Sequence, residues 1–202
     1  VWVALSASSL IALIEWDRFQ QLSQRPVLVF FGTLSAYLLI RMLRFEQINV
    51  QQKNDFKRWH EKHSQILLGF LAVSAALSGW IFLKFPWEER LFLVACSIPT
   101  TLYALPWLKN KGLRNFPGLK LVLIAGVWAL LLAYWPVMNA PGNHRPMVWA
   151  VFLFTLAITI PFDIRDMHTD APSMRTLPQL FGAKWAKILA LLLGLLAFPL
   201  LY

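Results

Sequence analysis

Seven long apolar runs divide this sequence of 202 residues, and they restrict its fold more than any other feature. An α-helix needs about 20 apolar residues to cross the hydrocarbon core of a membrane, and most of the runs approach that length. Nothing alternates apolar and polar residues with the period of two that a membrane β-barrel requires. We therefore expect an all-α fold, a polytopic transmembrane helical bundle. The predicted spans are residues 1–14, 27–43, 66–83, 91–108, 119–137, 147–162 and 185–202.

The charged residues are few, and most basic ones lie on alternate loops. Only 14% of the chain is charged, against about 25% in soluble domains, yet the net charge is +9. Five of the 19 Lys and Arg residues lie on the odd-numbered loops 15–26, 84–90 and 138–146, and the other fourteen lie on the even-numbered loops and their flanking helix ends. The positive-inside rule places the even-numbered loops in the cytoplasm. Because the basic residues are spread over membrane loops, we expect an integral, multi-pass protein with no nucleic-acid partner.

An acidic segment directly follows the sixth predicted span. Asp163, Asp166 and Asp170 are three of the ten acids of the chain, and at helical spacing they share one face. Carboxylate oxygens with room left for water and phosphate are typical Mg²⁺ ligands. Clustered carboxylates repel one another, so a bound cation or basic neighbours should accompany them. The alternative interpretation is an acidic cap that ends a span and is neutralised by Arg165 and Arg175.

The segment from Asp163 to Gly182 resembles the second aspartate-rich motif of the UbiA-type intramembrane prenyltransferases. The shared pattern is Asp-x-x-Asp-x-x-x-Asp followed by Arg175-Thr-Leu-Pro, and in that family it lies between the sixth and seventh helices, where the span count places it here. Tyr103-Ala-Leu-Pro-Trp-Leu-Lys109 likewise resembles the family's Tyr and Lys pattern in the loop after the fourth helix. The motifs cover about thirty residues, and the order of spans covers most of the chain.

The resemblance implies the transfer of a prenyl group from an isoprenyl diphosphate to an acceptor, commonly an aromatic ring. Aspartates of such motifs hold Mg²⁺, which stabilises the charge of the leaving diphosphate. Carried to this chain, Asp163, Asp166 and Asp170 would hold the metal on the cytoplasmic side. Tyr103 and Lys109 would face the diphosphate, with Arg165 and Arg175. The catalytic set implied by the resemblance is Asp163, Asp166, Tyr103 and Lys109.

The family's first aspartate-rich motif has no counterpart at the end of the second span. Residues 31–44 contain no acid and end in Arg41-Met-Leu-Arg44. Asn54-Asp55 follows later, but Arg58 and Lys62 stand where the next two acids belong, so we interpret it as coincidence. One hypothesis for Arg41 and Arg44 is that they bind substrate as fixed positive charge in place of one metal. The alternative is that Arg41 extends from near the helix end to the membrane interface.

Three function classes remain open on the sequence alone. The first is a Mg²⁺-dependent prenyltransferase, the second a non-catalytic or altered UbiA-like protein that binds isoprenoid or lipid, and the third a small transporter or assembly protein. The family has nine helices, and this chain starts without Met and stops in an apolar run. We expect a single UbiA-like domain over residues 1–202 that is trimmed at one or both ends. The sequence predicts neither the acceptor, nor the prenyl length, nor the oligomeric state.

Overall fold

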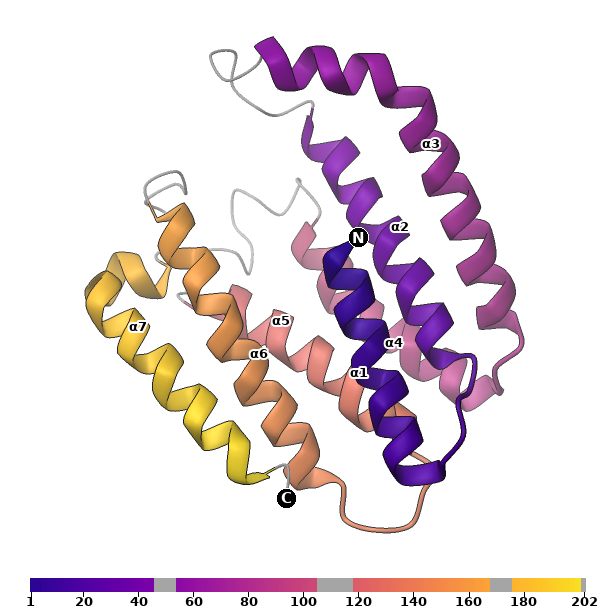
Figure 1. Cartoon of the computed structure of the whole chain (residues 1–202), viewed down its shortest axis with the longest axis vertical. Helices are drawn as coiled ribbons and strands as arrows, with labels where there is room; N and C mark the ends of the chain where they lie inside the picture. The colour runs from indigo at the N-terminus through magenta and orange to yellow at the C-terminus, as the bar shows by residue number, and fades with distance from the viewer. Residues whose placement is uncertain (46–53, 105–117, 168–175, 201–202) are drawn as a thin grey trace. The chain divides into compact units, whose positions relative to one another are not determined.

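The computed structural model describes residues 1–45, 54–104, 118–167 and 176–200, and within these ranges every regular element is a helix (Figure 1). This confirms the all-α fold class expected from the seven apolar runs. Within the described ranges each run falls on one helix, and two of the helices continue into short π or 3-10 turns. The elements are α1 (Trp2–Phe19), α2 (Arg25–Phe45), α3 (Asn54–Leu83), α4 (Trp87–Ala104), α5 (Leu119–Ala129) with the π-helix η4 (Leu130–Tyr134) and the 3-10 turn η5 (Trp135–Val137), α6 (Arg145–Asp166), and α7 (Leu177–Ala197) with the 3-10 turn η7 (Phe198–Leu200).

Four helical stretches of the described chain are long and apolar enough to cross a membrane. Most of their residues are not buried inside the protein, and large apolar side chains such as Phe70, Trp80 and Leu191 face outward. An outward apolar surface of this extent is suited to lipid and unsuited to water. The fold therefore has the character of an integral membrane protein, while the spans assigned to α1, α2 and α4 stay predictions. The four stretches are His63–Leu83, Leu119–Val137, Arg145–Asp166 and Leu177–Leu200.

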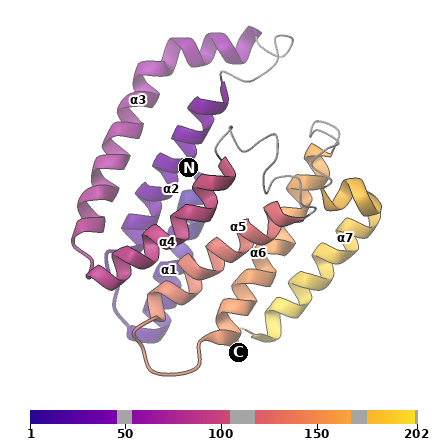
Figure 2. The same cartoon turned by 180° about the vertical axis from the view of Figure 1, so that it is seen from behind.

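The chain divides into two compact units, Val1–Arg90 and Leu91–Tyr202, and the boundary lies inside α4. In the first unit α2 packs against both α1 and α3. In the second unit α6 lies between α5 and α7, as the views from the front and from behind both show (Figures 1 and 2). The single domain expected over residues 1–202 stays a prediction.

The core of the second unit lies where α5, α6 and α7 meet. Leu121, Ile160 and Ala186 are each at most 2% exposed and form its centre, and Ile164 and Leu177 pack against them. Leu121 directly follows Lys120 on α5, and Ile164 directly follows Asp163 on α6. The apolar contacts therefore fix the relative register of the two helices that carry the acidic motif and its nearest cation.

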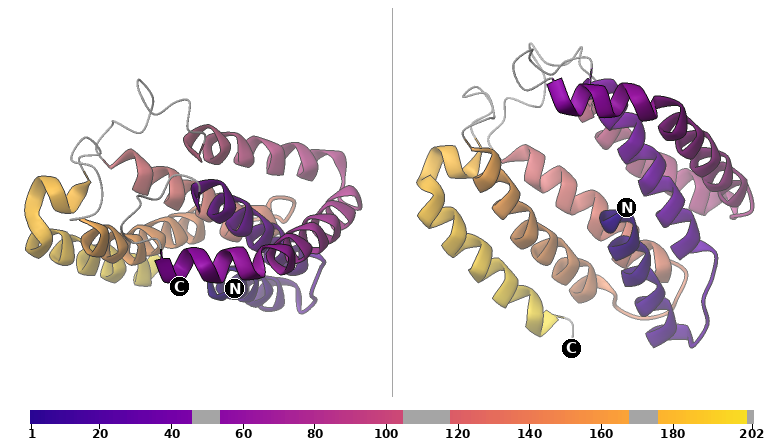
Figure 3. Two further views of the ribbon diagram at one scale, coloured as in Figure 1. Left: turned by 90° about the horizontal axis from the view of Figure 1, so that it is seen from above. Right: turned by 45° about the horizontal axis from the view of Figure 1, so that its top comes forward.

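Helix α7 is interrupted at Gly182, which has φ 81° and ψ 156°. This backbone conformation is essentially restricted to glycine. The first turn of α7 consequently lies at an angle to the rest of the helix, as Figure 3 shows. The seventh span was predicted to begin at residue 185, and the structure begins its helix at Leu177 with this separate turn.

Candidate functional site

The first carboxylate of the acidic motif, Asp163, is buried in the last turn of α6. Its side chain is 2% exposed, and Nζ of Lys120 on α5 donates a hydrogen bond to its Oδ1 over 2.6 Å. A buried charge is stable in a protein only when it is paired and hydrogen-bonded. Lys120 supplies that pairing across the interface between α5 and α6, and its own side chain is 32% exposed.

The second carboxylate, Asp166, lies one turn further along α6 and is more accessible. Its side chain is 35% exposed, and the neighbouring Arg165 binds both of its oxygens, with Nε 2.7 Å from Oδ1 and Nη2 3.0 Å from Oδ2. The Arg165 guanidinium also lies 5.4 Å from the centre of the Phe162 ring. Lys120 attracts Asp166 as well, through space. The two described carboxylates are thus both accompanied by basic neighbours, one of the two outcomes expected for such a cluster.

The described part of the site contains carboxylate oxygens, the kind of donor atom that usually binds a magnesium ion. Mg²⁺ is usually held through one or two carboxylates, with waters and substrate phosphates completing its shell. Asp163 and Asp166 provide two such carboxylates on successive turns of one helix. Within the described ranges no three His, Cys, Asp or Glu side chains come together as a metal site. The third predicted ligand, Asp170, lies outside those ranges.

Gln179 joins the two described ends of the acidic segment. Its Nε2 donates to the carbonyl of Met167 over 3.3 Å, and its Oε1 accepts from the backbone N–H of Thr176 over 3.0 Å. Thr176 is the N-cap of α7, and Pro178 occupies the first turn, where its missing N–H is harmless. The Thr-Leu-Pro-Gln sequence therefore begins α7 and also places that start beside the end of α6.

The other predicted site residues are only partly described. Tyr103 lies in the last turn of α4, and Arg41 and Arg44 lie in the last turns of α2, with their side chains outside what the structure describes. Lys109 and Arg175 lie entirely outside the described ranges. The structure therefore brings together Asp163, Asp166 and Arg165 from the predicted set and leaves the remaining assignments as predictions.

Lys120 is the residue that sequence reasoning missed. In the sequence it is one of the basic residues of the even-numbered side, and the family resemblance assigns it no role at the site. A signal was present, because Lys120 follows Gly118-Leu119 at the start of an apolar span. A cation inside such a span is rare without a partner. Asp163 is the nearest acid in the sequence on the same even-numbered side, but the pairing depends on the register between α5 and α6.

A second buried charge cluster lies within the first unit. Arg25, at the start of α2, binds Oε1 of Glu15 through Nη1 at 3.0 Å and Oε1 of Glu89 through Nη2 at 3.0 Å. Both glutamates are at most 3% exposed, and Ser23 donates its backbone N–H and its hydroxyl to Glu15. The sequence prediction assigned these residues only to odd-numbered loops. Their mutual bonding indicates a structural role at the ends of α1, α2 and α4.

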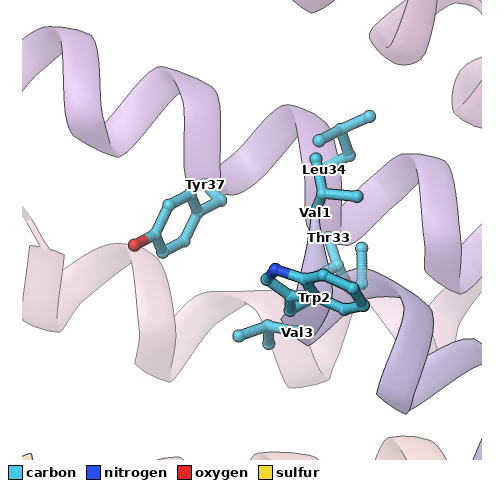
Figure 4. Close-up of a pocket in the computed structure, with 7 residues that line it drawn as sticks. Val1, Trp2, Val3, Thr33, Leu34 and Tyr37 are labelled. Atoms are coloured by element: carbon cyan, nitrogen blue, oxygen red, sulfur yellow. The ribbon is translucent and has the colours of Figure 1, made fainter.

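A pocket near the start of α1 is also confined to the first unit. Figure 4 shows Trp2 of α1 and Thr33, Leu34 and Tyr37 of α2 among the residues that line it. Its lining contains no charged side chain. The pocket therefore offers no counterpart to the missing first acidic motif.

Comparison of the chain with protein-family models, with curated proteins and with solved structures finds no match.

Proposed function

We propose that this chain is an intramembrane prenyltransferase of the UbiA type, which transfers a prenyl group from an isoprenyl diphosphate to an acceptor such as an aromatic ring. The observation that carries the proposal is the pairing of Lys120 with Asp163 beside Asp166 at one end of α6. Clustered carboxylates beside an ammonium group are suited to a diphosphate and its counter-ion. The motif resemblance adds the expected position between the sixth and seventh helices.

The proposed reaction breaks one bond of the prenyl diphosphate and forms one bond to the acceptor. The carbon–oxygen bond between the allylic carbon and the diphosphate breaks, and the diphosphate leaves with the electron pair. The allylic carbon then bonds to the acceptor, which releases a proton. A bound Mg²⁺ would neutralise charge on the departing diphosphate. Asp163 and Asp166 would hold that ion, while Lys120 and Arg165 are placed to donate hydrogen bonds to phosphate oxygens.

The charge distribution supports a cytoplasmic location for this site. Lys120, Arg165 and the other twelve basic residues of the even-numbered side belong to the same face as the acidic motif in the topology derived from the sequence. Together with the apolar helices, this distribution supports a multi-pass protein that receives its diphosphate substrate from the cytoplasm.

A second candidate function is binding of an isoprenoid or phospholipid without catalysis. Two observations favour it: Asp163 and Asp166 already have basic partners, and residues 31–44 contain no acid to complete a second metal-binding motif. Such a protein would retain an anion-binding end of the bundle and an apolar interior without turning over a diphosphate.

Incubation of the purified protein with labelled prenyl diphosphates of several lengths, with and without Mg²⁺, tests the proposal. We expect Mg²⁺-dependent release of diphosphate, which Asp163→Asn and Asp166→Asn each abolish. Asp17→Asn is the matched control, because Asp17 is a highly exposed acid in the first unit and its side chain is 74% exposed. Binding of the prenyl compound without release of diphosphate would favour the second function. The absence of both binding and release would reject both functions.

A further inference from the structure

The ion pair between Lys120 and Asp163 is asymmetric in its burial. The carboxylate is almost completely enclosed at 2% exposure, whereas the lysine side chain is 32% exposed and ends in a single ammonium group on a flexible four-carbon stem. The lysine can therefore leave the carboxylate by rotation of its own side chain, without movement of α5 or α6. The carboxylate has no comparable freedom, because it is enclosed at 2% exposure and joined to α6 by a single methylene group.

The charges around the motif place Lys120 in competition with any metal ion. In the structure the positive charges of Lys120 and Arg165 match the negative charges of Asp163 and Asp166. A divalent cation that takes an oxygen of Asp163 meets an ammonium group already bound there over 2.6 Å. Like charges at such separations repel strongly where little water intervenes. Either the lysine moves away or the metal ion does not bind tightly.

We propose, on the basis of the function proposed above, that Lys120 competes with the divalent cation for Asp163 and keeps the acidic motif closed to metal until a diphosphate is present. The phosphate oxygens then accept hydrogen bonds from the ammonium group that the metal ion displaces. Lys120 is thus a substrate-binding residue that also couples the binding of metal to the binding of substrate. The coupling prevents the site from filling with metal before its diphosphate arrives.

Electron paramagnetic resonance measures Mn²⁺ binding to the full chain in detergent and so tests the competition. We expect Lys120→Met to bind Mn²⁺ at least tenfold more tightly than the wild type in the absence of diphosphate. Lys120→Arg retains the positive charge and should bind Mn²⁺ as weakly as the wild type, which separates the effect of charge from a general effect on folding. Lys187→Met, at an exposed lysine of α7, is the control for loss of a positive charge elsewhere in the second unit.

A second measurement uses the wild type alone and does not depend on the folding of any variant. An ammonium group held against a carboxylate reacts slowly with an acylating reagent, so the rate of Lys120 acylation, measured by mass spectrometry, reports the ion pair. We expect Mn²⁺ at saturating concentration, which displaces the lysine by competition even without diphosphate, to raise this rate at least threefold, and added inorganic diphosphate to lower it again. The exposed Lys184 and Lys187 serve as internal references.

The outcomes separate this inference from the proposed function. Equal Mn²⁺ binding by the wild type and Lys120→Met, or an acylation rate that Mn²⁺ leaves unchanged, overturns the competition and leaves the prenyltransferase proposal in place. Absence of Mn²⁺ binding in both proteins, together with absence of diphosphate release, overturns the inference and the proposed function alike.

Discussion

The guanidinium of Arg25 forms a two-bonded ion pair with Glu89, with Nη2 3.0 Å from Oε1 and Nε 3.2 Å from Oε2, although 64 residues separate them in the sequence. The same guanidinium binds Glu15, so one cation compensates two buried carboxylates. Bidentate arginine–carboxylate pairs fix geometry as well as charge. The pair thereby ties the start of α4 to the turn between α1 and α2.

Arg25→Met should strongly destabilise the first unit. It leaves two enclosed carboxylates without a cation, and breaking a buried ion pair in this way costs about 3–5 kcal/mol. Thermal or denaturant unfolding of the purified protein measures the loss. Arg18→Met is the control, because the Arg18–Asp17 pair is exposed and 3.7 Å long, so its loss should cost at most about 1 kcal/mol. Similar losses for both variants would contradict the structural role of Arg25.

Lys120→Met should destabilise the protein more than Asp163→Asn does. The first variant leaves a carboxylate buried without a cation, at a cost of about 3 kcal/mol. The second leaves a lysine that reaches solvent, at a cost nearer 1 kcal/mol. Unfolding midpoints of the two variants and of the double variant provide the comparison. The double variant should match Asp163→Asn, and the reverse order of the single variants would show that the burial asymmetry has no energetic consequence.

Gly182→Ala should destabilise α7 by about 1–3 kcal/mol, because alanine does not readily adopt the backbone conformation found there. A Cβ at this position meets no atom within 4 Å, so the backbone alone carries the effect. Gly194→Ala in the same helix is the matched control: its Cβ would lie 3.8 Å from that of Ala157, and it should be neutral or stabilising by up to about 1 kcal/mol. Thermal unfolding distinguishes them, and equal shifts would show that Gly182 is replaceable.

Arg41→Ala should weaken the binding of a labelled prenyl diphosphate if Arg41 supplies positive charge in place of a missing metal. Loss of a charge-assisted hydrogen bond corresponds to about 1.5–3 kcal/mol, or roughly a tenfold to hundredfold rise in Kd. Arg18→Ala, on an odd-numbered loop, should leave binding unchanged. An unchanged Kd for Arg41→Ala would support the alternative, in which Arg41 extends to the membrane interface.

Single cysteines should reveal the predicted sidedness of the loops. Cys96 is the one native thiol, and Cys96→Ala removes it from the background. In intact cells we expect Asn139→Cys, at an exposed position of an odd-numbered loop, to react with a membrane-impermeant maleimide. Asn110→Cys, on an even-numbered loop, should react only after permeabilisation. Reaction of both without permeabilisation, or the opposite pattern, would contradict the orientation derived from the basic residues.

The helices could be predicted from the sequence because hydropathy alone decides where a chain can stay in lipid. The predicted fifth span, residues 119–137, coincides with the apolar stretch Leu119–Val137 that the structure forms. The start of α7 was placed eight residues too late, since its first turn is held by Thr176 and Gln179 and contains no long apolar run. Local polar contacts of this kind leave little trace in a hydropathy pattern.

The ion pairs of the candidate site were less predictable than the helices. The spacing of Asp163 and Asp166 showed that they share a helix face, and Arg165 was already expected beside them. The partner of Asp163 could not be derived, because it depends on how α5 and α6 are registered against each other. Arg25 and Glu89 present the same difficulty across a much longer separation, which only the packing of the helices resolves.

The break at Gly182 divides α7 into a turn tied to the acidic segment and a longer rod. Residues 183–200 rise by about 27 Å at 1.5 Å per residue, close to the roughly 30 Å of a hydrocarbon core. Trp185, 64% exposed near the start of the rod, is of the type that anchors a helix at the lipid headgroups. Ala186 on the rod packs against Leu121 and Ile160, so any change of its tilt in a bilayer of different thickness would move α5 and α6 with it. Gln179, on the other side of the glycine, bonds to Met167 and Thr176 and so joins the start of α7 to the end of the same α6.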